Sequence, residues 1–139
     1  MISTSAAADK GLVVKPSAYS VNETLDRLER VLKEKGLTIF TRIDHSAGAA
    51  KMQLNLRPTQ VLIFGNPKMG TALMHSNQAV GIDLPMKVLA WKDEQDRVWV
   101  AYNDPSYLAG RHQIHDRGEV LQKMTGALGK LTDKATSKP

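Results

Sequence analysis

The chain has 139 residues, enough for one domain, with 42% hydrophobic residues, 5% aromatic residues and a formal net charge of +5. It contains no cysteine, which excludes disulfides, a thiolate nucleophile and a cysteine-ligated zinc site. No apolar run reaches the length of about 18 residues that a membrane-spanning helix needs, so we expect no membrane span. The basic segments mix both signs of charge or lie at the chain end, which favours a solvated surface over a nucleic-acid interface.

Residues 1–10 are expected to form a disordered N-terminal tail. Ala6-Ala7-Ala8 before Asp9 resembles the small-residue end of a signal-peptide cleavage site, although the basic flank and the apolar core of a signal are missing. A remnant of a trimmed export signal and a plain disordered tail both fit this pattern. We therefore expect a periplasmic or secreted protein if a signal was trimmed, and a cytoplasmic protein otherwise.

The first half of the chain shows clear periodicity. A β-branched run over 11–17 predicts a strand, and the helix predicted over 20–36 begins with a capping-box pattern at Ser20 and Glu23 and ends at Gly36. Alternation over 37–45 predicts a half-buried strand. One side of it would carry Leu37, Ile39, Thr41 and Ile43, and the other Thr38, Phe40, Arg42 and Asp44. Residues 46–54 are expected to make a turn or two of helix, and the continuous apolar run 59–65 predicts an interior strand.

The segment FGNPKMGTALMHSNQAVGIDLP, residues 64–85, is dense in glycine and proline. Asn66 and Pro67 fit the N-cap and first position of a helix, which we expect to run to about Gln78 and to end by Gly81. Residues 83–93 and 96–104 predict an antiparallel hairpin. A further helix is expected from Pro105 until Gly118 breaks it, followed by a last helix over 119–135 and a loose C-terminal tail over 136–139.

This order of elements predicts an α+β single domain over residues 11–135. Strands outnumber crossover connections and a hairpin occurs, so we expect an antiparallel-rich sheet in β-α-β4-α order with helices packed on one face.

The chain also resembles a known family, through RPTQVLIFGNP (57–67), MGTAL (69–73), GIDLPMKVLAW (81–91) and VAYNDPSYL (100–108). These motifs are similar to those of the family catalogued as domain of unknown function 302, over about Gly11 to Leu131. The resemblance implies a TATA-binding-protein-like fold of β-α-β4-α order, frequent dimerisation, and an export signal ahead of the first strand in many members. It implies no catalytic residue, because no activity is established for the family.

We expect the segment 64–85 to help form a ligand-binding site, and a non-enzymatic module binding a small ligand or partner is our first hypothesis. The backbone at Gly65, Gly70 and Gly81 would allow close approach of a ligand. The start of the helix after Asn66 could bind an anion with help from Lys68 and Thr71, although the spacing of a Walker motif is not met. Further polar contacts are expected from Asn66, Asp83, Lys87 and Tyr102.

Two other classes of site stay open. An enzyme could use Asp83 or His45 as general acid or base, although aspartate in turns more often has a backbone role. A metal-binding protein could use His75, His112, His115 and Met74, since imidazole and thioether suit copper, although methionine usually fills a core. The sequence identifies no particular cofactor.

We expect a homodimer, because the family resemblance implies one and because an open sheet has edges to cover. A nucleic-acid partner is not expected: Thr38, Arg42, Lys87 and Lys92, assigned to outward strand positions, do not form a basic stripe.

Overall fold

The structure is a computed structural model that describes residues 10–139. The predicted N-terminal tail, with its possible signal remnant at Ala6-Ala7-Ala8, falls mostly in residues 1–9 and so lies outside the described residues. Among residues 10–139, no helix has both the length and the hydropathy to cross a membrane.

Five strands form one sheet in the order β1-β5-β4-β3-β2, and every neighbouring pair is antiparallel. The strands are β1 (Leu12–Ser17), β2 (Thr38–Asp44), β3 (Thr59–Gly65), β4 (Met86–Lys92) and β5 (Val98–Asn103). The predicted hairpin is the β4–β5 pair, and β3 is an interior strand as expected. The predicted α+β class and antiparallel sheet are therefore confirmed.

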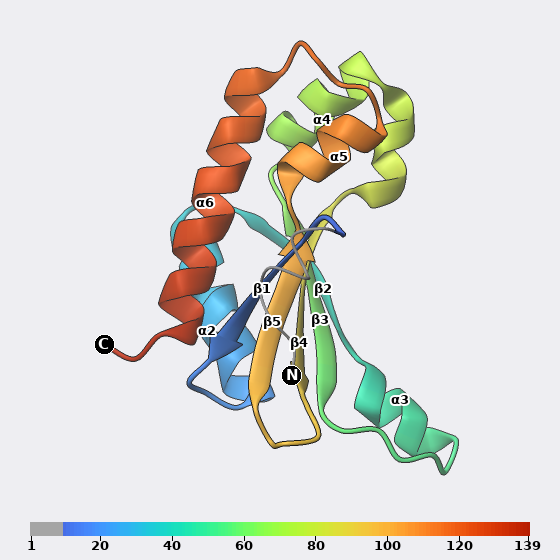
Figure 1. Ribbon diagram of the computed structural model, residues 1–139, viewed down its shortest axis with the longest axis vertical. Coiled ribbons are helices and arrows are strands. Elements are labelled where there is room, and N and C mark those ends of the chain that lie inside the picture. The colour runs from blue at the N-terminus through green and yellow to red at the C-terminus, as the bar shows by residue number, and fades with distance from the viewer. Residues whose placement is uncertain (1–9) are drawn as a thin grey trace.

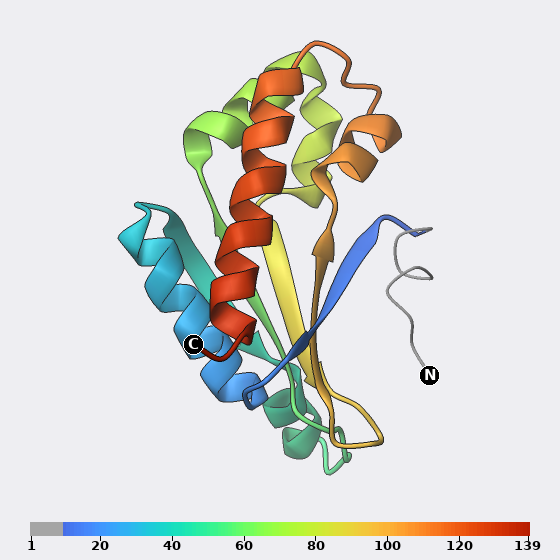
Figure 2. The same cartoon turned by 60° about the vertical axis from the view of Figure 1, so that its left-hand side comes forward.

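The helices occupy three places around the sheet. The two long helices, α2 (Val21–Glu34) and α6 (Gly118–Thr136), lie side by side across one face (Figure 2). At one end of the sheet lie α4 (Pro67–Ser76), the 3₁₀ helix η1 (Gln78–Asp83) and α5 (Pro105–Arg111) (Figure 1). At the opposite end α3 (His45–Lys51) projects from the connection between β2 and β3. No helix formed by residues 10–139 covers the second face of the sheet.

The core lies between the sheet and the two long helices. Leu25, Leu28 and Leu32 of α2 are at most 1% exposed, and they pack with sheet and α6 side chains that include Leu62, Phe64, Val88, Val100, Leu128 and Leu131. Because side chains along a β-strand alternate between the two faces of the sheet, the strand residues next to these core positions point to the uncovered face. There Val14, Trp99 and Ala101 form a second, smaller cluster with Trp91.

Several local signals act as predicted. The Ser20 hydroxyl accepts the N–H of Glu23, which caps α2. Gly36 takes a positive φ of 78° and lets the N–H of Leu37 reach the carbonyl of Leu32, the pattern of a Schellman motif. Asn66 caps α4, with Pro67 at its first position.

The predicted alternation in β2 is wrong beyond Ile39. Ile39 pairs with Phe64 and Thr41 pairs with Ile63, so Phe40 is an extra residue in a β-bulge. A bulge reverses which face the following side chains occupy. Arg42 consequently lies on the helix-covered face, where its guanidinium donates to Asp26 and Glu29 of α2, while Thr41 and Ile43 face the uncovered side.

Three helix ends differ from expectation. Helix α4 stops at Ser76, and Gly81 lies inside η1 rather than at the end of α4. The reason is that the side chain of Asn77 accepts the N–H of Ala79 and so caps a new helical turn. Helix α5 ends at Arg111, well before Gly118. Helix α6 continues to Thr136, which we placed in the C-terminal tail; Thr136 is 4% exposed and its carbonyl accepts the N–H of Ala18.

Candidate functional site

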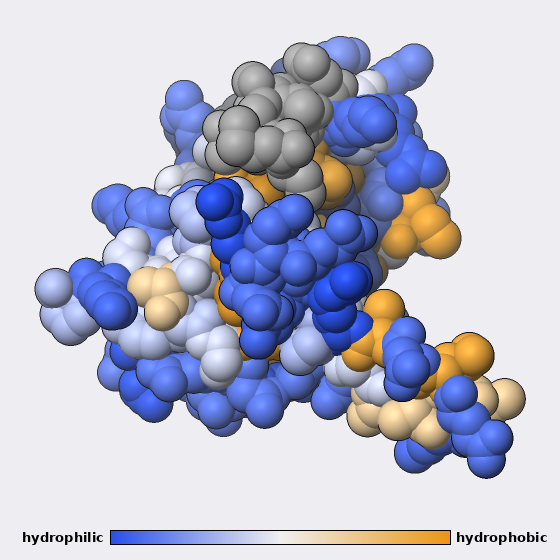
Figure 3. All heavy atoms as spheres, turned by 60° about the horizontal axis from the view of Figure 1, so that its bottom comes forward, coloured by the Kyte–Doolittle hydropathy of each residue, from blue (hydrophilic) through white to orange (hydrophobic). Residues whose placement is uncertain are grey.

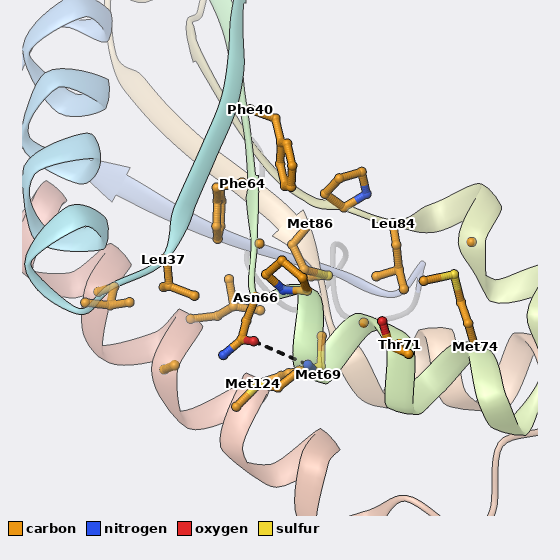
Figure 4. A pocket seen from close by; sticks show the side chains of 18 residues that line it. Leu37, Phe40, Phe64, Asn66, Met69, Thr71, Met74, Leu84, Met86 and Met124 are labelled. Atoms are coloured by element: carbon orange, nitrogen blue, oxygen red, sulfur yellow. Dashed lines mark hydrogen bonds between the residues drawn. The ribbon is translucent and has the colours of Figure 1, made fainter.

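A pocket of about 310 Å³ lies beside the end of the sheet that carries α4. Its walls come from the ends of β2 and β3, from α4, from the segment joining η1 to β4, and from the middle of α6 (Figure 4). The segment 64–85 therefore supplies one side of the pocket, and helix α6, which begins more than thirty residues further along the chain, supplies the other.

The pocket is lined almost entirely by apolar side chains. Phe64, Met86 and Leu128 are buried parts of the core that also face the pocket. Four methionines from three elements contribute to the lining: Met69, Met74, Met86 and Met124. Because methionine is unbranched and flexible, such walls can adapt to the shape of a bound apolar molecule.

Of the described residues that line the pocket, only Asn66 and Thr71 have polar side chains. The Oδ1 atom of Asn66 accepts the N–H groups of Lys68 and Met69 at 3.0 and 3.3 Å. Pro67 has no N–H group, and the N–H of Gly70 donates to the carbonyl of Asn66. The donors of the first turn of α4 are thus satisfied within the protein, which disfavours the anion site considered from the sequence.

The glycines of the segment differ in how much room surrounds them. A Cβ atom added at Gly70 would meet Leu84 Cδ1 at 3.8 Å and Met74 Cε at 4.0 Å, and one at Gly65 would meet Pro85 at 3.5 Å. These are ordinary van der Waals distances, so the space around Gly65 and Gly70 would admit a larger residue. A Cβ at Gly81 would lie 3.2 Å from the sulfur of Met74, which is tighter.

The nine residues predicted to contribute to a ligand site divide into two groups. Five of them line the pocket: Gly65, Asn66, Gly70, Thr71 and Gly81. Lys68 is exposed on α4, the ammonium of Lys87 donates to the carbonyl of Pro85, and Tyr102 is buried in the core at 5% exposure. These three side chains and that of Asp83 are not part of the lining.

Asp83 forms a polar cluster behind the pocket wall. One carboxylate oxygen lies 2.6 Å from Nε2 of His112, and both oxygens accept from Nη1 of Arg111 at 3.1 Å. Asn77 adds a bond of 2.7 Å from its Nδ2 to the carbonyl of His112. The cluster joins η1 to α5, and Leu84, the residue after Asp83, lines the pocket. We call Asp83, His112 and Asn77 the latch.

The remaining sequence candidates lie apart. His45 is exposed at the start of α3, at the other end of the sheet, while His75 and His115 are exposed and only His112 of the four histidines is buried. Within residues 10–139, no three histidine, aspartate or glutamate side chains are arranged to hold a metal ion. Met74 is the one proposed metal ligand that lines the pocket.

Sequence reasoning missed the wall contributed by other elements. Leu37, Phe40, Met124, Leu128 and Leu131 all line the pocket. The apolar stripe over 119–135 does indicate one buried face of a helix, but a periodic pattern does not reveal that part of that face borders a hollow.

The fold and the site together define the class of protein: a single α+β domain with an antiparallel sheet, two helices across one face and an apolar pocket at one end. Comparison with known sequences gives the particular family. The family described as "Domain of unknown function DUF302" matches residues 13–131, so the chain belongs to it and the predicted membership is confirmed.

The relatives include longer chains. The chain is 43% identical over 128 residues to the "Fluoride-specific ion channel FluC 1" of Brucella suis biovar 1 (strain 1330), covering 91% of this chain and 50% of that protein. A protein of the same name from Brucella abortus biovar 1 (strain 9-941) is also 43% identical, with 47% of it covered. The chain therefore spans about half the length of these curated relatives.

A solved structure shares the fold. The crystal structure of an uncharacterized conserved DUF302 protein from Bacillus stearothermophilus superimposes with a TM-score of 0.80, covering 90% of this chain and 98% of that one, at 21% sequence identity. At this level of identity the likeness concerns the fold.

Proposed function

We propose that this domain is a non-catalytic module that binds a small, uncharged and mainly apolar ligand in the pocket between the segment 64–85 and α6. One observation supports this most strongly: among residues 10–139, none of the side chains lining the pocket is titratable. General acid–base catalysis needs a group that can exchange a proton within hydrogen-bonding reach of the substrate. Asp83 is engaged in the latch outside the lining, and His45 lies at the opposite end of the sheet.

The dimensions and chemistry of the pocket indicate the ligand class. A volume of 310 Å³ corresponds to about ten water molecules at roughly 30 Å³ each, so a compact ring system or a short hydrocarbon chain would fill it. A charged group would lose its hydration among these walls without gaining a counter-ion, which favours neutral ligands. The Thr71 hydroxyl and the Asn66 Nδ2 atom have no protein hydrogen-bond partner within residues 10–139, so each could bind one polar atom of the ligand.

The proposal can be tested with the neutral fluorescent probe N-phenyl-1-naphthylamine. We expect saturable binding with an increase in probe fluorescence. The variant Gly70→Leu would place four extra carbon atoms beside Leu84 and Met74. Because leucine is a better helix former than glycine, the fold should tolerate the change while affinity for the probe falls about tenfold or more.

A matched control is Gly126→Leu, which makes the same substitution inside α6 where no atom lies within 4 Å of the added Cβ. This variant should bind the probe as the unmodified chain does. Equal affinity in the Gly70→Leu and Gly126→Leu proteins, both folded, would contradict the pocket as the binding site.

The names of the Brucella relatives favour a second candidate function, a role in fluoride handling as part of a longer channel protein. Direct fluoride binding would shift or broaden the fluoride ¹⁹F NMR signal when the chain is added. Because Asn66 occupies the first-turn donors of α4, we expect no change in that signal, and we expect any such role to act through the apolar ligand. Saturable fluoride binding by the chain would displace the first proposal.

We also propose that the domain forms a homodimer through the uncovered face of the sheet. This face carries the Trp91–Trp99 cluster, and Leu12 and Ile43 there are 38% and 41% exposed. Sedimentation equilibrium should give twice the 15.3 kDa chain mass. Ile43→Lys should yield the monomer, whereas Ile82→Lys, at a 75% exposed position of η1, should leave the dimer intact. A monomer at every concentration would refute this.

A further inference from the structure

A second feature with its own chemistry is the segment joining β2 to β3, residues 45–58, which we call the arm. It consists of α3 and the extended stretch after it, and it projects from the body of the protein at the end of the sheet opposite α4 (Figure 1). No residue of α3 is buried, and every residue of the following stretch 52–58 is exposed. The core therefore does not account for the apolar residues of the arm.

Three large apolar side chains stand on the arm in alternate positions. Met52, Leu54 and Leu56 are 73%, 64% and 49% exposed. In Figure 3 the arm extends away from the rest of the surface and carries a concentration of hydrophobic colour. Solitary exposed apolar residues are ordinary on a protein surface, but three within five positions on a projecting segment form a patch that indicates an interaction.

The end of α3 can be compared with two other helix ends in the same chain. Helices α2, α3 and α5 all finish in a Schellman motif, in which the N–H groups of Leu37, Leu54 and Ile114 reach the carbonyls of Leu32, Ala49 and Ala109. An apolar residue at this last position of the motif frequently packs against the final turn of its own helix. Ile114 is 4% exposed and Leu37 packs against the core, whereas Leu54 points to solvent. The arm thus presents outward a residue that the same motif buries elsewhere.

The charge of the arm has one sign. Residues 45–58 include Lys51 and Arg57 and no aspartate or glutamate. The preceding Asp44 is engaged in capping α3, with its carboxylate accepting from the N–H of Ala47 and the hydroxyl of Ser46. At the neighbouring β4–β5 turn, the carboxylate of Asp93 accepts the indole N–H of Trp99, Asp96 pairs with Lys92, and Glu94 is exposed, so the acidic residues lie on this turn and not on the arm. Lys51 and Arg57 form no ion pair within residues 10–139. An apolar tip flanked by two such cations is the composition of a segment that binds the interface of an anionic membrane.

We propose that the arm docks on a lipid bilayer that contains anionic phospholipid. Met52, Leu54 and Leu56 enter the boundary between headgroups and acyl chains, and Lys51 and Arg57 lie against the lipid phosphates. A second copy of this chain fits the arm less well, because two arms meeting would bring like charges together. With three apolar side chains and two cations the attachment is reversible rather than permanent. The arm and the pocket lie at opposite ends of the sheet, so this proposal is independent of the pocket ligand.

The test is flotation of the full chain with large unilamellar vesicles. We expect it to float with vesicles of phosphatidylglycerol mixed with phosphatidylcholine, and to bind pure phosphatidylcholine much more weakly. The triple variant Met52→Asn, Leu54→Asn, Leu56→Asn should lose at least about tenfold in partitioning. Replacing Lys51 and Arg57 by glutamine should weaken partitioning about fivefold for each cation. Added salt should also weaken partitioning, because it screens the attraction to the anionic lipid.

The matched control is Ile82→Asn, which removes an apolar side chain that is 75% exposed on η1, at the other end of the molecule. Its partitioning should equal that of the unmodified chain. All the altered positions are exposed, and circular dichroism checks that each variant is folded. No flotation of the unmodified chain, or equal flotation of the triple variant, would overturn the proposal. So would a loss of self-association in the triple variant without any change in vesicle binding, which would identify the arm as a protein contact.

Discussion

Replacing Asp83 by alanine is the change that best separates a structural role from a catalytic one. The Asp83 carboxylate is bonded to His112, which is 8% exposed, and to Arg111, whose side chain is 52% exposed. Loss of the carboxylate leaves a buried imidazole nitrogen without its partner, which costs about 1.5–3 kcal/mol. The Arg111 guanidinium can return to water, so its part is at most about 1 kcal/mol. We therefore expect Asp83→Ala to lower the free energy of unfolding by about 2–4 kcal/mol.

Urea unfolding followed by tryptophan fluorescence and circular dichroism measures this loss. Arg111→Met is the control, with an expected loss below about 1 kcal/mol because the guanidinium is half-exposed. A double-mutant cycle between Asp83→Ala and His112→Ala should give a coupling energy of about 1–2 kcal/mol. The latch interpretation would be refuted if the free energy of unfolding of Asp83→Ala lay within about 0.5 kcal/mol of that of the unmodified chain while the variant lost its affinity for the apolar probe.

Three further predictions concern the fold. Gln113 has a positive φ of 54° after α5. Gln113→Gly should therefore raise the free energy of unfolding in urea by about 0.5–1 kcal/mol. The control Gln122→Gly, inside α6, should lower it by a similar amount. Leu62→Ala, at a position with 0% exposure in β3, should cost about 2.5–5 kcal/mol in the same assay, and a loss below about 1 kcal/mol would contradict the proposed core. The Trp99 indole N–H holds the pKa of Asp93 below its ordinary value of 3.8. The ionised Asp93 carboxylate therefore stabilises the folded state fully above pH 3.8, and this stabilisation is lost as the pH falls through the lower pKa of the folded state. Tryptophan fluorescence should therefore show an acid transition with its midpoint below pH 3.8, and Asp93→Asn should abolish the transition.

The parts of the fold that the sequence predicted correctly depend on short-range rules. Ser20, Gly36 and Asn66 act within a few residues of their own positions, so their side chains or backbone preferences indicate the helix ends directly. The hairpin of β4 and β5 is similarly local.

The errors arise where tertiary contacts override a local preference. Phe40 becomes the extra residue of a bulge because Ile39 and Arg42 both have partners on the helix-covered face, namely the core and two carboxylates of α2. Gln53 and Gln113 adopt the left-handed conformation that the sequence rules assign to glycine, because the Schellman hydrogen bonds compensate for the local cost.

Five of the nine predicted binding residues line the pocket for a similar reason. Gly65, Asn66, Gly70 and Thr71 are neighbours along the chain, so one dense segment reveals them together. Met124 and Leu128 reach the pocket only because α6 packs against α2 across the sheet, and no pattern in a single sequence shows that pairing. Asp83 and His112 are 29 residues apart, and each was considered separately as a candidate for chemistry before the structure brought them together in the latch.

The central claim is that the pocket selects neutral apolar molecules over anions, and competition binding tests it most directly. Decan-1-ol and decanoate, which share a hydrocarbon chain and differ in charge, would each be titrated against the bound N-phenyl-1-naphthylamine probe at neutral pH. Because the lining carries no cation and the first-turn donors of α4 are occupied, we predict that the alcohol displaces the probe at a concentration at least about tenfold lower than the carboxylate. Equal or stronger displacement by decanoate would contradict the account.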